Sequence, residues 1–212
     1  MQSLYRVALS ATAVLGLAVA SASAQNLLAN PSFEDPVNPA APPFVGQWGS
    51  FNGGPGSGAG NSADSPRTGA LSLNMNIVGT DNTFAGAFQD VPGLTPGTNV
   101  EFSAWYRTPS NPLDLGFEAR IEWRDSVANT EISRTPNFTV APGSVYSQFT
   151  IPATVPVGAD LARVVFAVQT FGPEPTNNGI VYVDDASFVI PEPASLGTLA
   201  IAGTMLLRRR SR

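Results

Sequence analysis

The chain has 212 residues and a formal net charge of −5, and it contains no cysteine, histidine or lysine. Without cysteine and histidine it cannot form disulfides, thiolate or histidine metal centres, or the Ser-His-Asp and Cys-His groups of nucleophilic catalysis. Residues 25–190 hold six arginines against fifteen carboxylates, and this balance argues against a nucleic acid partner, whose phosphates need basic side chains.

Residues 1–24 have the pattern of a secretory signal peptide. Arg6 supplies the positive charge, residues 7–20 form an uncharged apolar stretch, and Ala22-Ser23-Ala24 fits an A-x-A cleavage site. The alternative is a membrane anchor, but the apolar stretch is shorter than the roughly 20 residues that a span needs. We therefore expect signal peptidase to release an exported chain that begins at Gln25.

Residues 25–190 predict one all-β domain. Apolar and polar residues alternate with a period of two, and no segment shows a clear helical period of 3.6 residues. Turn motifs rich in Pro-Gly and Asn-Gly separate the expected strands, which lie at 69–77, 83–91, 100–107, 115–124, 145–151, 161–170 and 180–189. This spacing is typical of a two-sheet antiparallel β-sandwich. The glycine-rich residues 49–62 are expected to form a mobile surface loop.

The strand at 100–107 carries a candidate sugar platform. Trp105 and Arg107 alternate with Phe102 and Ala104, so they lie on the outer face of the sheet if Phe102 and Ala104 belong to the core. An aromatic ring packs against the C–H face of a pyranose, and a guanidinium group binds its hydroxyls. In the alternative, the tryptophans of the chain are core or inter-sheet residues.

The strand at 115–124 carries a charged row, Glu118, Arg120 and Glu122, opposite an apolar face. With Trp105 and Arg107 this row predicts a carbohydrate-binding site; the alternative is a set of solvated ion pairs of little energetic value. Glu118 and Glu122 have the residue type of a glycosidase pair. Four residues along a strand place them about 13 Å apart, whereas such pairs need about 5–10 Å, so we expect no enzymatic activity.

The last 22 residues, 191–212, combine three features in order. Pro191, Glu192 and Pro193 precede a mostly apolar run, which ends in a basic cluster that includes Arg208, Arg209 and Arg210. Such a cluster resists export across a membrane. The order resembles the PEP-CTERM sorting signal of Gram-negative bacteria that make extracellular polysaccharide. The resemblance implies transient membrane insertion, processing by an exosortase, and delivery to the cell surface or extracellular matrix.

Several strings in the middle of the chain resemble carbohydrate-binding modules of families 4 and 9. They are NLLANPSFE at 26–34, RTGALSL at 67–73, FQDVPGLTPGTNVEFSAWYR at 88–107 and VYVDDASF at 181–188, with Trp48 between the first two. The resemblance implies a galactose-binding-like jelly roll. That fold hosts sugar binding, adhesion and purely structural roles, so it does not by itself specify the function.

The same resemblance implies a structural Ca²⁺ ion, held by Glu34, by an aspartate of the closing strand and by backbone carbonyls near residues 67–69. Calcium takes six to eight oxygen ligands, which these groups supply. Asp184 is preferred over Asp185, because its alternation with Phe188 would turn its carboxylate inward, where it needs a partner. In the alternative, Glu34 is a turn residue and Asp184 accepts backbone N–H bonds.

Together these features predict a secreted, non-catalytic protein that binds a polysaccharide. The main alternative is a structural or adhesive matrix protein of the same fold without a sugar site. A small surface glycoside hydrolase is less favoured, because histidine and cysteine are absent.

Overall fold

A computed structural model describes residues 24–39, 42, 44–78, 83–109, 115–170 and 179–191. The predicted signal peptide up to Ser23 and the predicted sorting segment from Glu192 onward lie outside these residues, and so do Pro193 and the terminal arginines. Within the described part of the chain, no helix is both long enough and apolar enough to cross a membrane.

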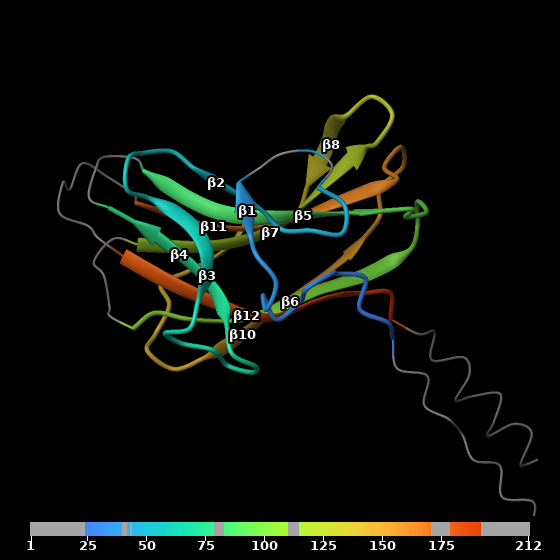
Figure 1. Ribbon diagram of the computed structural model, residues 1–212. Helices are drawn as coiled ribbons and strands as arrows, with labels where there is room; N and C mark the ends of the chain where they lie inside the picture. The colour runs from blue at the N-terminus through green and yellow to red at the C-terminus, as the bar shows by residue number, and fades with distance from the viewer. Residues whose placement is uncertain are drawn as a thin grey trace, which may run out of the picture. The chain divides into compact units, whose positions relative to one another are not determined.

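The described residues form twelve β-strands, which make two sheets packed face to face (Figure 1). The strands are β1 (Asn38–Pro39), β2 (Gly49–Asn52), β3 (Gly58–Ser62), β4 (Ser72–Ile77), β5 (Phe84–Pro92), β6 (Asn99–Arg107), β7 (Leu115–Asp125), β8 (Thr130–Arg134), β9 (Phe138–Val140), β10 (Ser147–Thr154), β11 (Leu161–Thr170) and β12 (Gly179–Val189).

The seven-stranded sheet has the order β1-β2-β5-β11-β7-β8, with β9 also paired to β7, and the five-stranded sheet has the order β10-β6-β12-β4-β3. The described strand pairs are antiparallel, apart from the two-residue pairing of β1 with β2. Strands distant in sequence are neighbours, as in β5-β11-β7, so the chain crosses repeatedly between the sheets. The predicted two-sheet antiparallel jelly-roll sandwich is confirmed.

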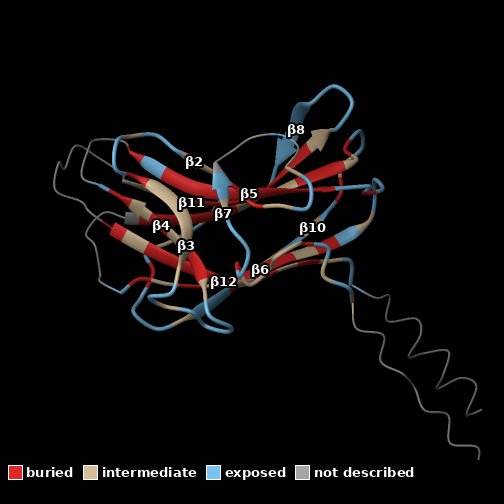
Figure 2. Ribbon diagram, viewed as in Figure 1, coloured by how far each residue is buried: buried red, intermediate tan, exposed pale blue. Residues whose placement is uncertain are grey.

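The core lies between the two sheets, and buried residues gather along the long strands of both, whereas β8 is exposed (Figure 2). The Phe166 ring of β11 occupies its centre, and its neighbours come from both sheets and from the N-terminal segment. Phe102 lies 5.3 Å from it and Phe117 6.3 Å, measured between ring centroids. Trp48 stacks on its other side at 5.5 Å.

Residues 49–62 do not form the predicted mobile loop. They form β2, which pairs with β5, and β3, which pairs with β4, joined by a turn at 53–57. The prediction was wrong because a glycine-rich segment needs no apolar side chains to add a strand to a sheet. The main-chain groups of the neighbouring strand provide its hydrogen bonds.

Candidate functional site on the outer face of the seven-stranded sheet

The predicted charged row of β7 lies on the outer face of the seven-stranded sheet. The apolar residues that alternate with it belong to the core, whereas Glu118, Arg120 and Glu122 point away from it. Glu118 is only 6% exposed and Glu122 only 7%. The alternative of solvated ion pairs is therefore wrong for these two carboxylates, because neighbouring side chains cover them.

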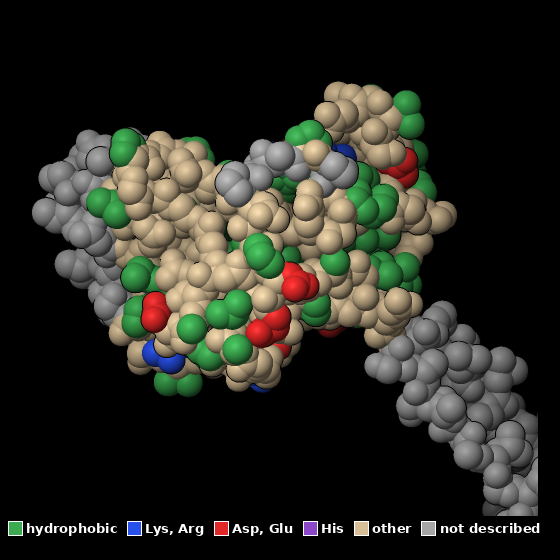
Figure 3. Space-filling model, viewed as in Figure 1, with side chains coloured by type: hydrophobic (Ala, Val, Ile, Leu, Met, Phe, Trp, Pro, Cys, Tyr) green, Lys and Arg blue, Asp and Glu red, His purple; other side chains and the backbone are tan. Residues whose placement is uncertain are grey.

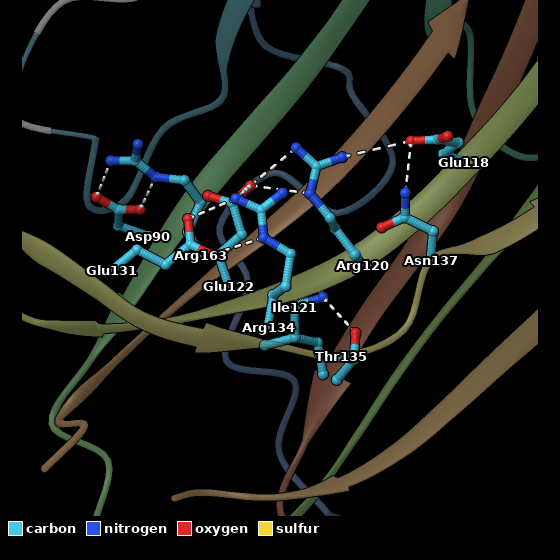
Figure 4. Close-up of polar contacts among 10 residues, drawn as sticks. All are labelled: Asp90, Glu118, Arg120, Ile121, Glu122, Glu131, Arg134, Thr135, Asn137 and Arg163. Atoms are coloured by element: carbon cyan, nitrogen blue, oxygen red, sulfur yellow. Dashed lines mark hydrogen bonds and ion pairs between the residues drawn. The ribbon is translucent and has the colours of Figure 1, made fainter.

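Strand register places further charged residues beside this row. Glu122 lies opposite Arg163 of β11 on one side and Arg134 of β8 on the other, and Arg163 lies opposite Asp90 of β5. The charges alternate in sign across four strands, so each charged side chain has an opposite charge beside it (Figure 4).

The ion pairs hold these side chains in fixed positions. Arg163 donates two hydrogen bonds to Asp90, from Nε to Oδ1 at 2.7 Å and from Nη2 to Oδ2 at 2.9 Å. The Nε of Arg120 donates to Glu122 at 2.8 Å, and its Nη1 lies 3.6 Å from Glu118. Planar guanidinium–carboxylate pairs of this kind constrain orientation as well as distance.

The ends of the network are fixed as well. Glu118 accepts hydrogen bonds from the side chains of Gln169, at 2.5 Å, and Asn137, at 3.1 Å. Arg134 donates to both oxygens of Glu131 at 2.6 and 2.7 Å, and this hydrogen bond lowers the pKa of Glu131. The charged side of the outer face therefore has its polar groups already oriented.

Phenylalanines of β2 and β5 form the other side of the same face. Phe51 lies 6.2 Å from Phe88 and 6.1 Å from Phe84, between ring centroids. A side chain at Gly86 would collide with the Phe51 ring and with the carbonyl oxygen of Phe166, so glycine is needed for the ring to lie over the strand. Phe88 is buried but lies outside the core cluster.

A cleft of about 230 Å³ lies where the two sides meet. Its apolar lining is Phe51, Phe88 and Val165, and its charged lining is Arg120, Glu122 and Arg163. An apolar floor with a few oriented polar groups is typical of sites for small organic ligands. By contrast, the charged side chains on the face shown in Figure 3 are few and scattered among the described residues.

The sequence predicted only part of this cleft. Phe84, Gly86 and Phe88 alternate with Ala85 and Ala87 in the expected strand at 83–91. From this alternation the sequence could have predicted that Phe84 and Phe88 share one face of the strand. Residue type alone predicts the wrong orientation, with the phenylalanines in the core. In the structure the alanines face the core and the phenylalanines face outward.

Trp105 and Arg107 do not join the charged row. They lie on β6 in the five-stranded sheet, and so on the opposite outer face of the sandwich. Phe102 and Ala104 are in the core as expected, and Trp105 is half-buried. The single site predicted from both strands is thus corrected to two separate faces, while the sugar-binding role of either group stays a prediction.

Trp105 is partly covered by the protein itself. The guanidinium carbon of Arg67 lies 3.9 Å from the centroid of the indole ring, and the same guanidinium bonds Asp185. Arg107 lies 5.8 Å from the ring centroid of Tyr146, and its Nε is buried without a hydrogen-bond partner among the described residues. The segment around Arg67 therefore occupies one face of the predicted platform.

Asp184 does not turn into the core as the sequence predicted. It lies opposite Trp105 in the strand register, and so on the outer face of the five-stranded sheet. A β-bulge follows between Asp184 and Ser187, with Asp185 at a φ of 47°. The extra residue returns Phe188 to the core, so simple alternation fails here.

The Asp184 carboxylate is fully buried because a neighbouring loop covers it. Its Oδ2 accepts hydrogen bonds from the backbone N–H groups of Arg67, at 2.7 Å, and Thr68, at 3.1 Å, and its Oδ1 accepts one from Asp185 at 2.7 Å. Burial raises the pKa of Asp184, and the backbone hydrogen bonds partly oppose that rise. Asp184 thus anchors the loop to the sheet.

Glu34 has a similar role. Its carboxylate accepts hydrogen bonds from the backbone N–H groups of Ala70 and Leu71 at 3.0–3.2 Å. Within the described residues, no three acidic side chains come together as a metal site. The contacts of Asp184 fit the alternative in which its carboxylate accepts backbone N–H bonds, and Glu34, expected there as a turn residue, binds backbone N–H groups as well. Calcium stays a prediction, and identical melting temperatures with added calcium and with a chelator would contradict it.

The sequence matches no protein-family model and no curated protein. Among solved structures, the chain is similar to the enzymatically active domain of tailspike protein 4 from bacteriophage CBA120 (TM-score 0.59, 16% identity). That alignment covers 78% of this chain and only 21% of the tailspike chain.

Two carbohydrate-binding modules are also similar. One is TmCBM61, solved in complex with β-1,4-galactotriose (TM-score 0.53, 13% identity, covering 79% of this chain and 99% of that one). The other is a CBM4 module (TM-score 0.53, 21% identity, covering 77% and 99%). The described domain therefore shares the β-sandwich fold of carbohydrate-binding modules.

Proposed function

We propose that this protein is a non-catalytic polysaccharide-binding protein whose site is the cleft on the outer face of the seven-stranded sheet. The observation that carries the proposal is the meeting of Phe51 and Phe88 with the fixed charged groups of Arg120 and Glu122 around one cleft. The fold shared with carbohydrate-binding modules, one of them solved with a bound galactotriose, supports it.

The two sides of the cleft match the two kinds of surface on a sugar. Phenyl rings pack against the C–H groups of a pyranose ring, while carboxylate and guanidinium groups bind its hydroxyls. Glu122 is held by Arg120 at 2.8 Å and lies 3.9 Å from Arg134. Because these side chains are already ordered, little conformational entropy is lost when they bind.

The same contacts disfavour hydrolysis. A glycosidase pair needs one carboxylic acid that donates a proton and one carboxylate that attacks or activates water. Glu118 and Glu122 instead pair with the same guanidinium, that of Arg120, and Glu118 also accepts two side-chain hydrogen bonds. Both carboxylates are therefore engaged as acceptors.

Phe51→Ala is expected to weaken retention on a polysaccharide at least about tenfold, which corresponds to about 1.4 kcal/mol. Affinity electrophoresis of the mature domain against a polysaccharide panel measures this effect. Phe51 is half-buried, so thermal melts are needed to show that the variant is folded. Trp105→Ala, on the opposite sheet, is the matched control and should keep wild-type retention.

Two outcomes would contradict the proposal. Loss of retention in Trp105→Ala but not in Phe51→Ala would move the site to the five-stranded sheet. If the wild-type domain binds no polysaccharide of the panel, a structural or adhesive matrix role of the same fold replaces sugar binding.

We further propose that residues 191–212 sort the protein to the cell surface or extracellular matrix through an exosortase. The order of Pro191-Glu192-Pro193, apolar run and basic cluster supports this. Intact-mass analysis of the extracellular protein is expected to show loss of residues 1–24 and of the terminal arginines. Recovery of a chain that still ends at Arg212 would contradict it.

A further inference from the structure

A second cavity adjoins the cleft on the same outer face. Its volume is about 340 Å³, and it lies toward the ends of β5 and β7. Arg163 belongs to the lining of both cavities. The residues of the second lining that matter here are Phe44, Val45, Asp90, Arg124, Asn129 and Arg163.

The two cavities follow one another along the strands. On β7 the lining passes from Arg120 in the first cavity to Arg124 in the second, and on β5 it passes from Phe88 to Asp90. Four residues of a strand span about 13 Å, which is longer than one pyranose ring. A ligand that reaches from Arg120 in the first cavity to Arg124 in the second must therefore contain more than one sugar.

Arg163 forms a rigid part of the wall that the two cavities share. Its guanidinium carbon lies 4.3 Å from the ring centroid of Phe88 and 5.1 Å from that of Phe44. Both its hydrogen bonds to Asp90 are short, and its side chain is only 17% exposed. The guanidinium is thus neutralised and lies over the edge-to-face pair formed by Phe88 of the first cavity and Phe44 of the second, whose ring centroids are 4.7 Å apart.

The second cavity repeats the chemistry of the first. Phe44 provides an aromatic ring, and the backbone fixes its place because Phe44 O accepts a hydrogen bond from Asp90 N at 3.1 Å. Val45 forms a bridge with Asp90. On the opposite side, Arg124 donates to the carbonyl and side-chain oxygens of Asn129 at 3.1 and 3.3 Å. The second cavity, like the first, therefore combines an aromatic ring with oriented polar groups.

We propose that the second cavity is a further subsite for the same polysaccharide, so that the glycan chain lies along the strands and passes over Arg163. This inference rests on the proposed function. It adds the direction of the bound chain and a requirement for length: the protein recognises an extended segment of the polymer rather than a single sugar.

The test is calorimetry with a size-fractionated hydrolysate of the polysaccharide that retains the wild-type domain, from disaccharide to hexasaccharide. Wild-type affinity is expected to rise at least about tenfold with chain length. Asn129→Gly removes a side chain that lines only the second cavity and suits the positive φ of 52° at this position. Asn129→Gly should reduce this rise in affinity while it keeps disaccharide affinity within about twofold. Phe44→Ala should abolish the rise; because Phe44 packs on Phe88 of the first cavity, its affinity for longer chains is compared with its own disaccharide affinity.

Phe51→Ala serves as the reference, because it should weaken every length by the same factor. The second subsite is overturned, while the proposed function stands, if Phe44→Ala and Asn129→Gly leave the increase of affinity with oligosaccharide length intact. The same holds if they weaken the affinity for oligosaccharides of every length equally. Absence of wild-type binding at any length would overturn the proposed function, and the subsite with it. Thermal melts of both variants show whether each is folded.

Discussion

Replacement of Trp48 by alanine is expected to lower the free energy of unfolding by about 3–5 kcal/mol. Trp48 is fully buried and stacks on Phe166 at 5.5 Å, with Phe33 at 5.0 Å on another side. Its indole N–H donates to the carbonyl oxygen of Asn30 at 3.0 Å. The substitution leaves a large cavity beside the central ring of the core and removes this hydrogen bond.

Chemical denaturation followed by circular dichroism measures the loss. Trp105→Ala is the control, because it removes the same residue type from a half-buried position where the main contact is Arg67. A cation–π contact is worth about 0.5–1 kcal/mol at an exposed site, so this variant should lose clearly less stability than Trp48→Ala. Equal losses would show that Trp105 is a structural anchor comparable to Trp48.

Asp184→Ala is expected to lower the free energy of unfolding by about 2–4 kcal/mol. The change leaves the backbone N–H groups of Arg67, Thr68 and Asp185 without their acceptor, and a buried donor without a partner costs about 1–3 kcal/mol. Removal of a buried charge offsets part of this cost, since burial raises the pKa of Asp184. Urea denaturation of wild type and variant measures the difference.

Asp184→Asn is the matched control, because it keeps one acceptor oxygen and removes the charge. It should lose less stability than Asp184→Ala; an equal loss would mean that the charge, not the hydrogen bonds, matters. The raised pKa means that the folded protein holds this proton more tightly than the unfolded chain. Wild-type stability should therefore rise relative to Asp184→Asn as the pH falls through that pKa.

The fold class was predictable from local pattern. Seven expected strands are present with ends shifted by a few residues, as for β6, expected at 100–107 and observed at Asn99–Arg107. Alternation with a period of two is a property of the strand itself, so it is readable without knowledge of any partner. The strands that were not predicted include β8 and β9. They are short or exposed, and the two faces of each strand differ little in hydrophobicity.

Local pattern in the sequence was thus enough to predict seven of the strands, the sandwich and the outward row Glu118, Arg120 and Glu122 on β7. Which sheet each strand joins is set by the folding of the whole chain, which separates Trp105 from the row and places Phe88 and Arg163 beside it. The physical reason is that sheet membership depends on hydrogen bonds between distant segments. Alternation of apolar and polar residues shows that the two faces of a strand differ. What lies opposite each face depends on the packing of the whole chain.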